Sequence, residues 1–251
     1  MLKYIYKHKY YLLILLVERD VSVMNDNDAS ITATSTTSIS FSKIKRCFYL
    51  LVKRLVDIIG SLIGMILLIP ISLIIKIISV CHGDFYSIFY TQERIGKNGK
   101  PFKLYKFRSM VPNADEILFN MLKEDKKIRE EYQENKKLKD DPRITKLGKF
   151  IRRYSIDELP QLLNVFGGSM SLVGNRPYLP REKKDMGSYY KYIIKTKPGI
   201  TGWWQVSGRN DVSFKRRLIL EKYYSNNQSL KLDILIFFKT FRAVFGGKGA
   251  K

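Results

Sequence analysis

The most prominent pattern along the chain is a long apolar segment, residues 55–80. Its 26 residues would form a helix of about 39 Å at about 1.5 Å per residue, longer than a bilayer core of about 30 Å. Pro70 lies inside it and predicts a kink or a break, because proline removes a helix hydrogen bond. Basic residues flank both ends, which favours the same side of the membrane for both. The pattern therefore predicts a re-entrant membrane helix broken at Pro70, with a kinked spanning helix as the alternative.

The residues before this segment differ from it in pattern. Residues 1–20 combine Lys3, Lys7 and Lys9 with an apolar stretch that is too short to cross a bilayer as a helix. Residues 25–42 are rich in Ser, Thr, Asn and Asp. We therefore interpret residues 1–42 as an anchor-like extension followed by a flexible linker, residues 43–82 as the re-entrant helix, and residues 83–251 as one folded domain.

Short β-like and helical patterns alternate through residues 83–251. Asn98-Gly99, between apolar and aromatic stretches, predicts a β-hairpin within residues 85–110. Apolar residues at multiples of three and four predict a helical insert over residues 113–140, interpreted as a packing or dimerisation helix. Further helices are predicted near residues 157–166, 212–227 and 230–245, the last of them amphipathic and lying on the membrane. The predicted fold class is a small α/β (α+β) domain, mostly helical, with a short β-hairpin or sheet.

Composition and charge narrow the range of partners. Hydrophobic residues make up 45% and charged residues 27%, which argues against a disordered chain. The net charge of +22 fits nucleic acid, an anionic membrane surface or a polyphosphate substrate, or else a basic surface without a specific partner. Cys47 and Cys81 form no metal-binding or disulfide pattern. Trp203 and Trp204 are predicted to pack in the core.

Candidate chemistry concentrates at the acidic pair Asp157–Glu158, which follows a basic cluster. This cluster contains Lys146, Lys149, Arg152 and Arg153. Ser155 and Glu158 have the spacing of a capping box, in which Asp157 would merely complement the helix dipole. Alternatively, a helix start that gathers positive charge around a carboxylate suits a phosphate-bearing substrate. A carboxylate can attack phosphorus as a nucleophile, and its neighbour can bind Mg²⁺.

Further basic residues could accompany this pair. Lys106 and Arg108 lie in YKFRSM, Arg176 lies in GNRP, and Arg209 lies in SGRN. Each arginine could bind phosphate oxygens through two parallel hydrogen bonds, although each one alone is also typical of a protein surface. The chain contains no Gly-rich P-loop, no Rossmann fingerprint and no nucleophilic Ser or Cys motif.

An ordered series of motifs resembles the bacterial sugar transferases, the monotopic phosphoglycosyl transferases of the membrane. The motifs are KRLVD (53–57), TQERIGKNGKPFKLYKFRSM (91–110), DPRITKLGKFIRRYSIDELPQLLNV (141–165), MSLVGNRP (170–177) and KPGITGWWQVSGRND (197–211). The similarity extends from about residue 53 to the C-terminus. It implies a re-entrant helix broken at a proline and a small α/β catalytic domain on the cytoplasmic face of the bacterial inner membrane.

The resemblance also implies a Mg²⁺-dependent reaction in two steps. Asp157 matches the carboxylate that would attack the β-phosphorus of a UDP-sugar, expel UMP and hold a phosphosugar, which undecaprenyl phosphate would then take. Glu158 matches the metal-binding acid of the family. The basic residues with which the family binds phosphate and nucleotide correspond to Lys106, Arg152, Arg176 and Arg209. The implied partners are a UDP-sugar, undecaprenyl phosphate and membrane lipids, with no nucleic acid, and a homodimer is a further option.

The chain departs from the family pattern at several places. Ile69 precedes Pro70 where the family has serine, and Asn175 replaces the first proline of GPRP. The 113–140 insert and the C-terminal KGAK resemble members that transfer galactose 1-phosphate, which favours UDP-galactose and leaves glucose or an N-acetylated sugar open. The alternative functions are a basic membrane-tethered protein that binds nucleic acid and a non-catalytic scaffold.

Overall fold

The computed structural model describes residues 36–135, 138–208 and 212–245. The chain divides into two compact units, residues 1–47 and residues 48–251. Most of the predicted N-terminal extension lies outside the described residues. Helix α2 (Thr36–Cys81) already includes the last residues of the predicted linker, and the description that follows concerns the second unit.

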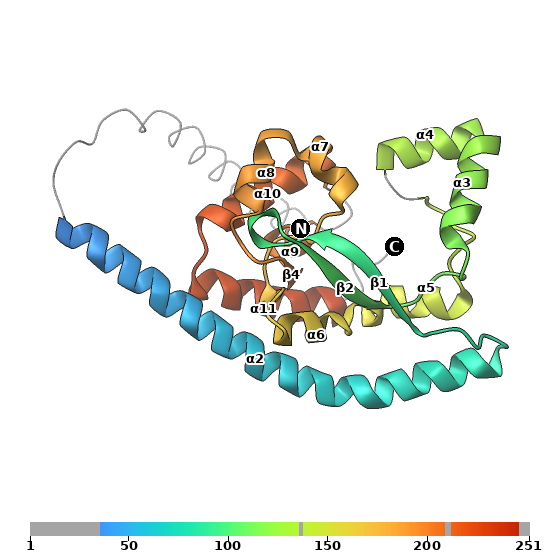
Figure 1. Ribbon diagram of the computed structural model, residues 1–251, viewed down its shortest axis with the longest axis horizontal. Helices are drawn as coiled ribbons and strands as arrows, with labels where there is room; N and C mark the ends of the chain where they lie inside the picture. Colours follow the sequence, from blue (N-terminus) through green and yellow to red (C-terminus); the bar gives the residue numbers. More distant parts are fainter. Residues whose placement is uncertain (1–35, 136–137, 209–211, 246–251) are drawn as a thin grey trace, which may run out of the picture. The chain divides into compact units, whose positions relative to one another are not determined.

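Helix α2 continues through Pro70 without interruption, so the predicted break does not end the helix. The missing N–H of Pro70 leaves one carbonyl of the preceding turn without its helical donor. In the same region the Ser72 hydroxyl donates to the Leu68 carbonyl at 2.7 Å, a back-bond that also favours bending. Figure 1 shows α2 as a curved helix, which fits these local causes. Whether its path through a membrane is re-entrant stays a prediction.

One face of α2 packs against the rest of the second unit. The buried residues on this face include Asp57, Ser61, Leu68 and Ile75. Their spacing of four and seven residues places them on one side of the helix. Polar anchors reinforce the contact, because the Asp57 carboxylate accepts hydrogen bonds from the Leu172 amide at 2.8 Å and from the Ser171 hydroxyl at 2.9 Å.

The predicted hairpin is confirmed. Strand β1 (Phe89–Ile95) pairs antiparallel with β2 (Pro101–Phe107), and its register places Ile95 opposite Pro101 at the turn. Asn98 has φ of 57° and Gly99 has φ of 78°. These left-handed conformations are the ones that asparagine and glycine tolerate best, which explains why the dipeptide marks the turn.

The 113–140 insert forms two helices instead of the single helix predicted, α3 (Ala114–Glu124) and α4 (Lys126–Asn135). Asp125 between them has an extended backbone, and its carboxylate accepts hydrogen bonds from the amides of Lys127 and Ile128. An aspartate with these bonds caps a new helix, so the polar side chain competes with continuation of the first one.

The remaining elements complete a small domain with two short sheets. They are α5 (Lys146–Arg153), α6 (Gln161–Phe166), β3 (Ser171–Val173), α7 (Lys183–Met186), α8 (Tyr190–Ile193), β4 (Gly199–Thr201), α9 (Trp203–Val206), α10 (Phe214–Asn226) and α11 (Leu230–Phe245). Strands β3 and β4 pair in parallel. Helices α10 and α11 agree with the two C-terminal helices predicted.

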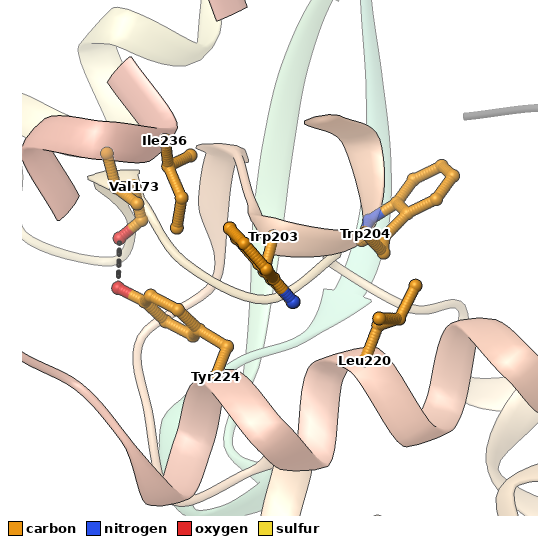
Figure 2. Close-up of a cluster of buried hydrophobic side chains, with 6 residues drawn as sticks. All are labelled: Val173, Trp203, Trp204, Leu220, Tyr224 and Ile236. Atoms are coloured by element: carbon orange, nitrogen blue, oxygen red, sulfur yellow. Dashed lines mark hydrogen bonds between the residues drawn. The ribbon is translucent and has the colours of Figure 1, made fainter. Parts of the chain in front are cut away.

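Both tryptophans pack in the core, as predicted. Figure 2 shows Trp203 and Trp204 of α9 in one buried cluster with residues of β3, α10 and α11. In that cluster the Tyr224 hydroxyl oxygen lies 3.2 Å from the Val173 carbonyl oxygen. The cluster holds α9 and α10 against the sheet β3–β4, next to the loop that carries Arg176.

The surface of α2 opposite the domain is apolar. Its exposed side chains include Ile59, Ile63, Ile66, Ile69 and Leu73. Within the described residues, this is the one helix long and apolar enough to cross a membrane, with a mean hydropathy of 2.7 over its best window. So much exposed apolar surface is costly in water, which makes α2 the element suited to contact lipid.

Candidate active site

The acidic pair lies in a short 3-10 turn, Ile156–Glu158, between α5 and α6. The capping-box interpretation is wrong, because the Ser155 side chain makes no cap hydrogen bond and its backbone is left-handed, with φ of 57°. The predicted helix over residues 157–166 likewise starts later, at Gln161. A left-handed non-glycine residue beside candidate catalytic groups is a strained conformation that the surrounding structure must hold in place.

Packing under the turn fixes the direction of the two carboxylates. Ile156 and Leu159 pack against a buried cluster that contains Phe107 of β2 and Ile151 of α5. Because these apolar side chains point into the core, the intervening acidic residues point away from it. The Asp157 side chain is 13% exposed and that of Glu158 is 31% exposed.

Lys106 of β2 joins the two acids. Its ammonium lies 3.3 Å from Glu158 Oε1 and 3.8 Å from Asp157 Oδ2. Burial raises the pKa of Asp157 above its usual range, and the positive charges of Lys106 and Arg152 oppose that rise. Arg152 is held on the other side by a hydrogen bond from its Nε to the Ser109 hydroxyl at 2.7 Å. The structure therefore brings together four of the predicted site residues.

Arg176 is the fifth predicted residue at this site. It lines a small open pocket, with a cavity volume of about 20 Å³, together with Lys106, Glu158, Arg94 and other residues. The other lining residues are Leu104, Gln161, Pro177, Gly199, Ile200 and Gln205. Among the described residues its guanidinium has no ion-pair partner. A pocket with one exposed carboxylate and several cations suits a phosphate-bearing ligand and a divalent metal.

Asn175 gives a structural reason for the departure from GPRP. Its side-chain amide nitrogen is buried and lies within hydrogen-bond distance of the Ile193 carbonyl, the Thr196 hydroxyl and the Ser225 hydroxyl, the last at 2.7 Å. These bonds tie the loop before Arg176 to α8 and α10. In the family pattern the ring of a proline would stiffen this loop. Here the hydrogen bonds of Asn175 hold the loop in place.

Two predicted site residues are not brought to the pocket by the described structure. Arg108 donates both Nη2 bonds to the Asp84 carboxylate, at 2.7 and 2.8 Å, and its other donors go to the carbonyls of Ser87 and Met110. This arrangement ties β2 to the segment after α2. Arg209 lies outside the described residues, so its position stays a prediction.

The residues present fit a Mg²⁺ ion held by Glu158. Mg²⁺ in nucleotide sites is bound by one or two carboxylates, with substrate phosphates and water filling the other positions. The adjacent acids on one turn, with Glu158 facing the pocket, match that donor set. The described residues contain no cluster of three or more acidic, histidine or cysteine side chains that would hold a metal without substrate.

Sequence reasoning missed three residues of the pocket, Arg94, Gln161 and Gln205, and also Arg217, which contacts Trp204 beside Arg176. Arg94 lies in β1, within the stretch QERIG. Side chains alternate between the two faces of a strand, and the sequence does not show which face is buried. Arg94 is only 8% exposed, and its Nη1 donates to the Pro177 carbonyl at 3.0 Å. Burial lowers its pKa to about 10, with repulsion from Arg176 as the next cause.

Comparison with known proteins identifies the family of the chain. The family profile described as bacterial sugar transferase matches residues 48–247. The chain is 48% identical to the UDP-galactose-lipid carrier transferase of Erwinia amylovora and 46% identical to the undecaprenyl-phosphate galactose phosphotransferase of Salmonella typhimurium, each over 79% of this chain and 41% of the relative. It is 42% identical to the exopolysaccharide production protein ExoY of Sinorhizobium fredii, over 79% of this chain and 87% of that protein.

The chain spans about two fifths of the length of the first two relatives and most of the third. The matched region begins within α2 and ends after α11, so it contains the acidic pair, Lys106, Arg152 and Arg176. This extent, together with the ordered motifs, shows that the chain belongs to the bacterial sugar transferase family.

Proposed function

We propose that this protein transfers a sugar 1-phosphate from a UDP-sugar to undecaprenyl phosphate, with release of UMP, as the first step in synthesis of a surface polysaccharide. The observation that carries the proposal is the acidic pair beside Lys106, with Glu158, Lys106 and Arg176 lining one pocket. The names of the relatives, which refer to a galactose phosphotransferase, a lipid carrier transferase and exopolysaccharide production, support the same reaction class.

The reaction follows from a carboxylate nucleophile. In the first step an Asp157 carboxylate oxygen forms a bond to the β-phosphorus, the bond to the bridging oxygen breaks, and its electron pair leaves with UMP. In the second step a phosphate oxygen of undecaprenyl phosphate attacks the same phosphorus, and the electron pair returns to the Asp157 carboxylate. The product is a sugar diphosphate lipid, and no external oxidant or reductant is needed.

The basic residues would stabilise charge at two places. Lys106, within reach of both carboxylates, opposes protonation of Asp157 and can donate to the phosphoryl oxygens under attack. Arg176 faces the same pocket and can bind the phosphate that leaves with the nucleoside. Mg²⁺, held by Glu158, would offset the charge of the diphosphate when it is bound.

The long apolar helix supports action at a membrane. The exposed apolar face of α2 fits contact with acyl chains, as the lipid acceptor requires. We propose the cytoplasmic face of the inner membrane, where UDP-sugars are made. The nucleic-acid alternative rests on net charge alone, and no feature of the pocket favours it.

The direct test is UMP release from a panel of UDP-sugars by the full-length protein with undecaprenyl phosphate and Mg²⁺. The panel contains galactose, glucose and the N-acetylated sugars, and we expect the galactose donor to be preferred. Asp157→Asn should abolish UMP release and also retention of label from a donor carrying ³²P at the β-phosphate. Asp140→Asn, at an exposed acid, is the matched control. Undiminished UMP release by Asp157→Asn would disprove the covalent mechanism.

A further inference from the structure

Two arginines contact the same tryptophan. The guanidinium carbon of Arg217, on α10, lies 4.3 Å from the Trp204 ring centroid, and that of Arg176 lies 5.7 Å from it. Trp204 is itself 6% exposed, in the core cluster of Figure 2. One arginine stacked on an indole is common in proteins. A second guanidinium at the same ring adds repulsion between like charges, so the arrangement calls for a further explanation.

The polar atoms around this pair lack partners. The Nε atoms of Arg176 and Arg217, the Trp204 Nε1 and the Gln205 Oε1 are buried without a hydrogen-bond partner among the described residues. Buried polar atoms are rarely left unpaired in native proteins. Three of these four atoms are donors, and they occur together with two positive charges. Glu221 Oε2 and the Tyr178 hydroxyl are also buried without a hydrogen-bond partner among the described residues. A cluster with this composition indicates an anionic oxygen ligand.

The nearest carboxylate does not neutralise the two arginines. Glu221, one turn after Arg217 on α10, is 1% exposed, and its Oε1 accepts a hydrogen bond from the Arg176 amide at 3.0 Å. Burial raises the pKa of Glu221 to about 8, so at neutral pH the carboxyl is mostly protonated. The pKa of Arg217 is lowered, first by burial and then by the charge of Arg176. The cluster therefore keeps an excess of positive charge.

The pocket at the acidic pair adjoins this cluster. Arg176 and Gln205 line that pocket together with Lys106 and Glu158. Lys106 and Arg176 thus line the same pocket, and Arg217 contacts the Trp204 ring that Arg176 also contacts. A nucleoside diphosphate sugar carries two phosphates, so cations at two places suit it.

We propose that Arg217 and Arg176, supported by Trp204, form a second anion site that binds the phosphate remaining on the departing nucleotide. The proposal rests on the proposed function and adds a residue, Arg217, to the binding of its substrate. The two guanidiniums would bind the charge that develops on UMP as the phosphorus–oxygen bond breaks. They would also retain UMP more tightly than uridine, which has no phosphate.

The test measures binding of UMP and of uridine to the full-length protein by calorimetry. Arg217→Gln should weaken UMP binding by about tenfold or more, the usual effect of a charge-assisted hydrogen bond, and leave uridine binding unchanged. Arg217→Lys, which keeps the charge, should retain part of the UMP affinity. The control is Lys215→Gln, an exposed charge on the same helix, which should match the wild type.

The outcomes separate the two proposals. If Arg217→Gln binds UMP within twofold of the wild-type affinity, the second anion site is overturned. An equal loss of UMP and uridine binding also overturns it, because that result would show a packing role for Arg217 beside Trp204. If thermal unfolding shows that Arg217→Gln does not fold, Arg217→Lys decides, and unchanged UMP affinity in that variant overturns the site. Absence of UMP release from every UDP-sugar by the wild type contradicts the proposed function, independently of the binding result.

Discussion

Two carboxylates near the pocket differ in exposure, and in the proposed function this difference gives them different roles. Asp157 lies on a turn with Lys106 and Arg152 beside it, so cations oppose the effect of burial. Glu221 lies fully inside the domain and accepts one hydrogen bond from a backbone amide. The first can reach a substrate phosphate. The second supports the backbone that carries Arg176.

The burial of Glu221 predicts a pH-dependent stability. Its pKa is about 8 in the folded protein, above its usual value of 4.5, so the folded state binds a proton that the unfolded state has lost. Stability from this residue is present below about pH 4.5 and falls as the pH rises toward 8. Glu221→Gln removes the titration. The melting temperature of this variant minus that of the wild type should therefore increase from pH 5 to pH 8, and a constant difference would contradict the assignment.

Arg108 is expected to affect stability and not substrate binding. All three of its guanidinium nitrogens donate to groups within the protein, including two bonds to Asp84. Arg108→Gln should lower the melting temperature and leave the KM for the UDP-sugar within about twofold. Asp84→Asn should reproduce the effect on stability. A large increase in KM in a variant of normal stability would restore the role first predicted for Arg108.

Some of these residues could be found from the sequence and others could not. Asp157, Glu158, Lys106 and Arg176 belong to short motifs whose order along the chain indicated a site. The capping box failed because the conformation of Ser155 depends on how Ile156 and Leu159 pack, which local spacing does not encode. Arg217 belongs to no motif quoted for the site, and only its position over Trp204 reveals it.

At the scale of elements, α2 is joined to the domain by a polar network. The Lys53 ammonium lies 2.7 Å from Asp233 Oδ2 of α11 and also donates to the Val173 carbonyl. Asp233 accepts further hydrogen bonds from the hydroxyls of Tyr49 and Tyr224. Both side chains of the ion pair are 12% exposed. If one partner is removed, little water can reach the remaining charged group to take its place.

Removing one member of this pair should therefore destabilise the protein strongly. Asp233→Asn leaves the Lys53 ammonium buried without its counter-charge, at an expected cost of about 3 kcal/mol. The melting temperature in detergent should fall by roughly 2–4 °C for each kcal/mol. The control is Lys126→Ala, at a pair whose side chains are 84% and 64% exposed, which should cost less than about 0.5 kcal/mol. Equal effects of the two variants would contradict a buried anchor.

The elements were predictable to the extent that their causes are local. The β1–β2 turn follows from Asn98-Gly99, and the long apolar run gave α2. The division between α3 and α4 depends on Asp125 capping a new helix, a signal weaker than the apolar repeat around it. Strands β3 and β4 are only three residues each and pair over a long separation, so no periodicity marks them.

At the scale of the whole molecule, the path of α2 can be tested with the native cysteines. The chain has two, Cys47 and Cys81, and both are exposed, one early in α2 and one at its end. A re-entrant path predicts that a membrane-impermeant maleimide labels neither in intact cells and both after permeabilisation. Cys47→Ser and Cys81→Ser assign each signal to one site. A helix that spans the membrane would show one labelled cysteine before permeabilisation.

The bonds of Asp57 to Ser171 and Leu172 connect α2 to the loop that carries Arg176, so the orientation of α2 in a membrane should affect that loop. Strand β3 begins at Ser171 and leads directly to Asn175 and Arg176. Through these bonds we expect a change in the tilt of α2 to move the loop that carries Arg176. The thickness of the membrane would affect the tilt of α2 and, through it, the height of the pocket above the head groups. We therefore expect the turnover rate to depend on the acyl-chain length of the lipids.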